Sequence, residues 1–124
     1  MVFRIAIGRC DCRAPYNDPA DEKACETIQQ TLDDWRSRLP SDLGSIPAEN
    51  SEEQFIEGRR VTFSVYKIDG GRGTLVVYQA LVHSWKRPTL LSIGTVGRLY
   101  AEGLLVTGDS EVHPAPDDLM WQFR

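Results

Sequence analysis

Apolar side chains alternate with other residues at the start of the chain, which is the pattern of a strand with one buried face. In residues 2–8, VFRIAIG, Phe3, Ile5 and Ile7 fall on one side, and the run ends at Gly8. Successive side chains of a strand point to opposite faces, so this spacing of two predicts a strand.

A helical period follows between residues 18 and 40. Asp18 can accept hydrogen bonds from the first helical turn, Pro19 suits the first helical position, and Pro40 marks the end. Apolar residues recur every three or four positions at Ala24, Ile28, Leu32, Trp35 and Leu39. The sequence therefore predicts an amphipathic helix whose apolar stripe packs against a sheet.

Two further apolar runs, residues 59–68 and 74–85, predict a β-hairpin. The connecting residues 69–73, DGGRG, contain three glycines that can take positive φ in a tight turn. With 69–73 as the loop, Val61 pairs with Leu81 and Tyr66 pairs with Val76. This register places a set of alternate residues under the helices: Val61, Phe63, Val65, Leu75, Val77 and Leu81.

The other segments are less regular. Residues 41–58 have no sustained period and hold a cluster of carboxylates, so we expect a long surface loop there. Residues 92–103, SIGTVGRLYAEG, have an apolar spacing typical of a short helix that ends at Gly103. Residues 104–107 predict a short strand, and residues 119–123 a final strand or packed tail.

The predicted order is strand, helix, strand, strand, helix, strand, which indicates one α+β domain over residues 1–124. This order matches the ferredoxin-like split βαβ plan, an antiparallel sheet with two helices on one face. The alternative is a cystatin-like arrangement, in which a curved sheet cradles the first helix. Both plans place the stripe around Trp35 on the sheet.

Charge is unevenly distributed along the 124 residues. The net charge is −6 over residues 1–58, +6 over 59–98 and −4 over 99–124. These segments either neutralise one another in the fold or form a basic face for an anion. The candidate anion-binding residues are Arg59, Arg60, Lys86, Arg87 and Arg98. The acidic pI of about 5.1 and the lack of a nucleic-acid motif argue against nucleic acid as a partner.

Three cysteines, Cys10, Cys12 and Cys25, are the only thiols. An odd number argues against a disulfide framework, and one residue between Cys10 and Cys12 is unusual for zinc. We expect no metal and no cofactor, with Cys25 packed as a reduced thiol.

No apolar stretch approaches the ~20 residues of a membrane helix, and Arg4 interrupts a start too short for a signal peptide. These features predict a cytoplasmic protein that does not bind membranes.

The residues favour a binding domain over an enzyme. His83 and His113 are the only histidines, and no nucleophile, metalloprotease or phosphate-loop motif accompanies them. We expect a non-catalytic domain that contacts a protein partner or forms a homodimer, as an immunity-type or antitoxin-type inhibitor would. The hairpin face opposite the helices supplies the candidate partner-binding residues: Tyr66, Val76, Tyr78 and Val82.

Two other functions fit the sequence. One is a small dimeric ferredoxin-like enzyme whose apolar pocket lies near His83, Trp85 and Tyr78. The other is an anion-binding regulatory domain that uses the arginines and lysine named above. A deep pocket at His83 would favour the enzyme, and convergence of the cationic side chains on one concave site would favour the regulator.

Overall fold

The computed structural model describes residues 6–10, 12, 16, 18–83 and 95–123. Its elements, in chain order, are β1 (Ala6–Cys10), α1 (Pro19–Arg38), the 3₁₀ helix η1 (Leu43–Ser45), β2 (Glu49–Ile56), β3 (Arg59–Gly70), β4 (Gly73–His83), β5 (Thr95–Val106), β6 (Val112–Pro114), α2 (Asp117–Met120) and the 3₁₀ helix η2 (Trp121–Phe123). The α+β class predicted from the sequence is confirmed.

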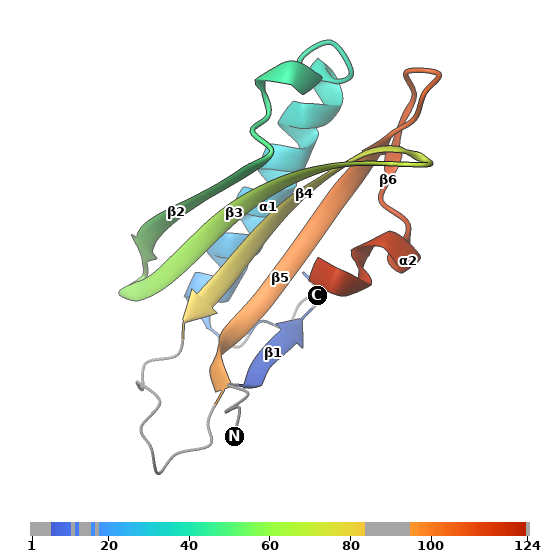
Figure 1. The fold of residues 1–124 in the computed structure, drawn as a ribbon. Helices are drawn as coiled ribbons and strands as arrows, with labels where there is room; N and C mark the ends of the chain where they lie inside the picture. Colours follow the sequence, from blue (N-terminus) through green and yellow to red (C-terminus); the bar gives the residue numbers. More distant parts are fainter. Residues whose placement is uncertain (1–5, 11, 13–15, 17, 84–94, 124) are drawn as a thin grey trace.

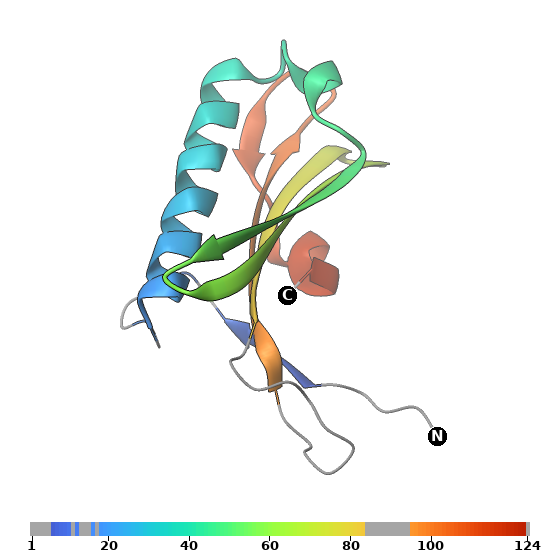
Figure 2. The same cartoon turned by 90° about the vertical axis from the view of Figure 1, so that its left-hand side faces the viewer.

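All described strands belong to one sheet with the order β1-β5-β4-β3-β2 (Figure 1). β2 to β5 are antiparallel neighbours, whereas β1 pairs with β5 in parallel, and β6 pairs with the far end of β5. Figure 2 shows the sheet curving, with α1 along one face and α2 on the other.

The ferredoxin-like order is not observed, because the described part of the short helix expected at residues 92–103 is a strand. It belongs to β5 (Thr95–Val106), which also includes most of the strand predicted at 104–107 and pairs with β4 along ten residues from Gly97 to Val106. Two glycines disfavour a helix here. Gly97 lies so close to β4 that a Cβ would overlap the carbonyl oxygen of Val82. This fold has one long helix across a curved sheet, a feature that it shares with the cystatin-like alternative.

The prediction of an amphipathic helix is confirmed in α1. Asp18 is its N-cap and accepts a hydrogen bond from the backbone N–H of Ala20 at 2.9 Å, and Pro19 occupies the first turn. The helix ends before Leu39, whose N–H donates to the carbonyl of Trp35. The whole predicted stripe is buried against the sheet: Ala24, Ile28, Leu32, Trp35 and Leu39.

The hairpin is present, but its register differs by one residue from the prediction. Gly70 pairs with Gly73 around a two-residue turn, and Val61 pairs with Val82 instead of Leu81. A shift of one residue exchanges the two faces of a strand. Val76 and Val82 are therefore fully buried in the core under α1, and the predicted partner-binding face of β4 does not exist.

The segment 41–58 is not a loop, because η1 and β2 occupy most of it. Seven of the eight residues of β2 are exposed and Ile56 is half-buried, so the strand has no apolar face that a pattern search could detect. Its position is set by backbone pairing with β3 along its whole length, from Glu49 with Tyr66 to Ile56 with Arg59. β2 is therefore a polar edge strand.

The second face of the sheet is covered in part by α2 and η2. A smaller core lies between these segments and the sheet, formed by Leu75, Val77, Ala101, Leu105, Met120 and Phe123. Tyr66 packs against this core with its ring 5.6 Å from that of Phe123, and Gln79 donates to the carbonyl of Phe123 at 2.8 Å. The closing residues thus form the packed tail that the sequence allowed.

Candidate functional site

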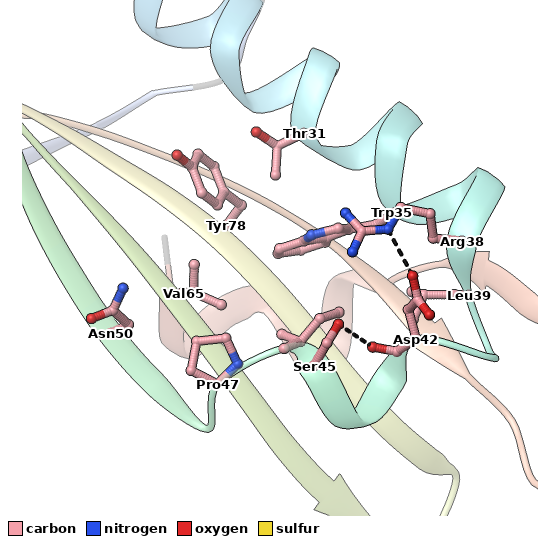
Figure 3. A pocket seen from close by; sticks show the side chains of 11 residues that line it. Thr31, Trp35, Arg38, Leu39, Asp42, Ser45, Pro47, Asn50, Val65 and Tyr78 are labelled. Carbon is pink, nitrogen blue, oxygen red and sulfur yellow. Dashed lines mark hydrogen bonds and ion pairs between the residues drawn. The ribbon is translucent and has the colours of Figure 1, made fainter.

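A cavity of about 280 Å³ opens between the second half of α1, the η1 segment and strands β2 to β4 (Figure 3). Its walls come from five consecutive parts of the fold. The residues that line the cavity are Thr31, Trp35, Arg38, Leu39, Asp42, Ser45, Ile46, Pro47, Asn50, Val65 and Tyr78. Tyr78 is the one predicted partner-binding residue that lines this cavity.

Aromatic contacts form one wall of the cavity. The ring of Trp35 meets the ring of Tyr78 edge-on at a centroid distance of 5.9 Å, and Phe63 stacks on Tyr78 at 5.7 Å. Such pairs add about 0.5–1.5 kcal/mol beyond the area they bury, so these contacts stabilise the wall in the absence of a ligand. Leu39 and Val65 extend the apolar surface.

Polar groups lie on the side of the cavity that faces β2. Figure 3 shows Thr31 from α1, Tyr78 from β4 and Asn50 from β2 around the same space. Burial raises the pKa of Tyr78; its hydrogen bond with Thr31 lowers it, and the nearby charge of Glu52 raises it. Because the net shift is upward, the phenol stays protonated at neutral pH and can donate or accept a hydrogen bond.

The rim of the cavity carries Arg38, which two carboxylates already hold. Its Nε donates to Asp42 at 2.8 Å and its Nη1 to Asp34 at 2.9 Å. These hydrogen bonds, first that of Asp42 and then that of Asp34, raise the pKa of Arg38. A guanidinium between two carboxylates offers little attraction to an anionic ligand, so the cavity is not an anion site.

The edge strand β2 next to the cavity is acidic. Residues 41–58 contain five carboxylates and no basic residue. Glu53 pairs with Arg60 at 2.9 Å, and Glu57 pairs with Lys23. Glu49 and Glu52 form no ion pair with any described residue, so their charges are available to a partner.

The candidate anion-binding residues do not converge on an open site within the described chain. Arg59 and Arg98 both reach Asp18, at 2.8 and 2.9 Å, and Arg98 also holds the fully buried Asp21 through two contacts at 2.7 and 3.1 Å. Two cations and two carboxylates thus form a neutral cluster at the start of α1. Arg60 pairs with Glu53 as described above, while Lys86 and Arg87 lie outside the described residues.

His83 does not line the cavity, because it lies on the opposite face of β4 from Tyr78. Its Nδ1 is 3.2 Å from Arg60 Nη2 and its Nε2 is 2.9 Å from Thr62 Oγ1. A guanidinium only donates, so Nδ1 accepts and Nε2 carries the proton. Burial and then Arg60 lower the pKa of His83, which favours this neutral form. The enzyme interpretation expected His83, Trp85 and Tyr78 to line one pocket. His83 and Tyr78 do not share a pocket, and Trp85 lies outside the described residues.

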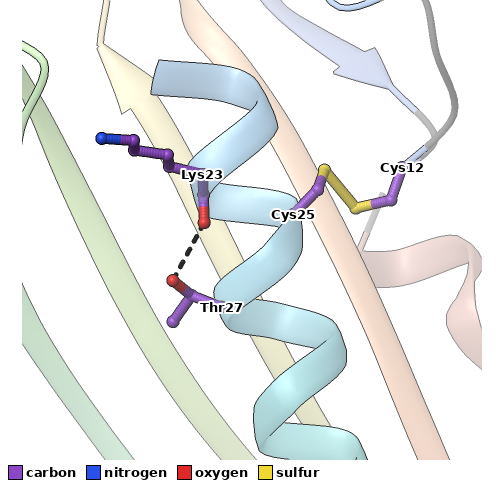
Figure 4. The surroundings of a disulfide bond; sticks show 4 residues. All are labelled: Cys12, Lys23, Cys25 and Thr27. Carbon is purple, nitrogen blue, oxygen red and sulfur yellow. Dashed lines mark hydrogen bonds between the residues drawn. A yellow bond between two sulfur atoms is a disulfide. The ribbon is translucent and has the colours of Figure 1, made fainter. Parts of the chain in front are cut away.

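Two of the three cysteines are joined, contrary to the prediction of a reduced Cys25. A disulfide links Cys12 to Cys25, connecting the segment after β1 to α1 (Figure 4). Sequence spacing missed this bond because the partners are 13 residues apart and meet only when α1 packs on the sheet to which β1 belongs. The described residues contain no cluster of three or more His, Cys, Asp or Glu side chains that could hold a metal ion.

No family model, curated protein or solved structure matches this chain. Within the described residues, no helix is long and apolar enough to span a membrane. The site must therefore be interpreted from its own chemistry. It combines a preformed cavity, a set of neutral hydrogen-bonding groups and an acidic strand edge, and it brings together residues that sequence reasoning did not single out, Thr31 and Asn50 among them.

Proposed function

We propose that this protein is a non-catalytic binding domain that recognises a basic, extended segment of a partner protein along the outer edge of β2. The observation that carries the proposal is the edge strand itself. No described strand pairs with that edge, and seven of its eight residues are exposed. A strand of this kind presents unpaired backbone N–H and C=O groups to which an extended segment can hydrogen-bond.

The charges on β2 indicate the chemistry of the partner. Glu49 and Glu52 lie on opposite faces of the strand, because odd-numbered and even-numbered residues of a strand point to opposite faces of the sheet. A partner strand would meet a carboxylate on either face. Opposite charges on directly paired strand positions stabilise by roughly 0.2–1 kcal/mol each, so Lys or Arg in the partner is favoured.

The same charges argue against self-association through this edge. If β2 paired antiparallel with β2 of a second copy, the three most overlapping registers would place Glu52 opposite Glu53, Glu52 opposite Glu52, or Glu53 opposite Glu53. Like charges at paired positions destabilise a ladder. A different protein with a basic strand is therefore favoured over a homodimer, a pairing suited to an immunity-type or antitoxin-type inhibitor.

Selection from a displayed library of random seven-residue peptides tests this function. Peptides selected on the wild type should be rich in Lys and Arg, and they should bind at least tenfold more weakly to the double variant Glu49→Lys, Glu52→Lys. The matched control is Glu22→Lys, Glu26→Lys, which makes the same change in net charge at exposed positions of α1. This control should retain most of the binding.

Amide chemical shifts should locate the selected peptides on β2. The proposal fails if the selected peptides are no more basic than the starting library. It also fails if both double variants lose binding equally, because net charge alone would then explain the selection.

A further inference from the structure

The cavity and the edge of β2 are continuous. Asn50 belongs to β2 and lines the cavity, and Glu52 follows it on the same face of the strand, opposite Phe63. Side chains on paired strands start about 5 Å apart, and a Lys or Arg side chain is longer than that distance. A residue of an added strand that pairs near Asn50 or Glu52 can therefore extend its side chain over β2 to the edge of the cavity that Asn50 lines.

The lining of the cavity suits a long side chain that is apolar along its stem and cationic at its end. Leu39, Ile46 and Val65 offer apolar surface for the stem. The rings of Trp35 and Tyr78 can lie against a cation, and aromatic faces attract cations by about 0.5–2 kcal/mol. A volume of about 280 Å³ is at the small end of ligand pockets, which suits one side chain better than a cofactor.

The charges near the cavity select against an anion. Arg38 is held by Asp34 and Asp42, so its charge is balanced within the chain. Glu52 forms no ion pair with a described residue, although it is close enough to Tyr78 to affect the titration of the phenol. Acceptors for an incoming cation include the Tyr78 hydroxyl and the Asn50 amide oxygen in the lining and the Glu52 carboxylate next to it.

We infer that the cavity receives a Lys or Arg side chain from the segment bound along β2. The inference rests on the proposed function, since the partner strand supplies the side chain. It adds a specificity site: one position of the bound segment must be basic, while the positions whose side chains point to the opposite face of the sheet are less restricted.

Small molecules that imitate single side chains test the cavity without a partner. The probes are n-butylguanidinium, its anionic counterpart pentanoate and the neutral 1-pentanol. In ¹H–¹⁵N spectra of the full chain, we expect n-butylguanidinium to shift the indole N–H of Trp35 and the side-chain amide of Asn50 in a saturable way. Pentanoate should produce no shift, and 1-pentanol should bind at least threefold more weakly than the cation.

Substitutions locate the bound probe. Asn50→Trp places a large ring at the cavity and should abolish the effect of n-butylguanidinium, whereas Gln54→Trp, on the same face of β2 but outside the lining, should not. Glu52→Gln should weaken binding at least threefold. Thermal melts of each variant establish that it is folded.

Two results would overturn the inference. One is equal or stronger binding of pentanoate or 1-pentanol, and the other is no saturable shift at the cavity with any probe. Basic peptides that bind β2 and leave the Trp35 indole signal unshifted would refute this inference but not the proposed function. Binding of n-butylguanidinium in the cavity without any selection of basic peptides would instead refute the proposed function.

Discussion

Substitution of Asp21 by asparagine should destabilise the fold strongly, although the two side chains have nearly the same shape. Asp21 is completely buried in the first turn of α1, and both of its oxygens contact Arg98, at 2.7 and 3.1 Å. Asparagine keeps one acceptor but turns an amide group with two donors toward a guanidinium. The substitution therefore leaves a cation facing a neutral partner in a largely buried site.

The expected cost can be worked from this geometry. Removing one partner of a buried ion pair costs about 3–5 kcal/mol. Arg98 is 20% exposed and retains Asp18, so we take the lower end, about 3 kcal/mol. With a urea m-value of about 2 kcal/mol/M, the unfolding midpoint should fall by about 1.5 M. The control Asp33→Asn removes an exposed pair with Arg36 and should change stability by less than about 0.5 kcal/mol.

Urea melts of a double-mutant cycle would show whether the ion pair is the cause. Asp21→Asn combined with Arg98→Met should be more stable than the sum of the two single effects predicts, because the second substitution removes the cation left without its partner. The reasoning is refuted if Asp21→Asn costs less than about 1 kcal/mol. It is also refuted if the two effects add within about 0.5 kcal/mol.

Three further predictions follow from other parts of the structure. Burial and Arg60 lower the pKa of His83, so the folded state binds fewer protons than the unfolded state, and the free energy of unfolding should decrease as the pH falls below about 6.5. Urea melts of His83→Gln at pH 7.5 and 5.5 should show a smaller decrease than the wild type. Gly97→Ala should cost at least about 2 kcal/mol, because its Cβ would overlap a β4 carbonyl, whereas Gly108→Ala, with nothing within 4 Å, should be nearly neutral. Because one disulfide involves two of the three cysteines, mass spectrometry of the denatured chain should count one alkylated thiol before reduction and three afterwards; three before reduction would contradict the bond.

The helix could be predicted from the sequence because every local signal agreed. The cap at Asp18, the prolines at both ends and the apolar stripe all indicate the same boundaries, and they act between residues close in the chain. β2 gave no such signal, since its position depends on backbone pairing with β3 and its side chains are exposed on both faces. The acidic composition of residues 41–58 was visible, but its placement on a strand edge was not.

The register of the hairpin was ambiguous because β4 is apolar on both faces. Val76 and Val77 are both fully buried, one under α1 and the other under α2 and η2. Alternation of apolar and polar residues normally identifies the buried face of a strand. A strand that is covered on both sides has no polar face that could be assigned to solvent. The length of the turn decided the register, and the five candidate turn residues 69–73 left that length open. The cavity was equally hidden, since its walls are assembled from residues that lie between positions 31 and 78.

The parallel pairing of β1 with β5 constrains the order in which the chain can fold during its synthesis. Residues 6–10 of β1 pair with residues 95–100 of β5, whereas β2 to β5 pair with their neighbours along the chain. At a synthesis rate of about 5–20 residues per second, β1 is without its partner for on the order of ten seconds. The helix and the hairpin can form from local contacts in that interval. A chain interrupted before residue 95 would carry a complete α1 but no partner for β1 and none for the outer edge of β4.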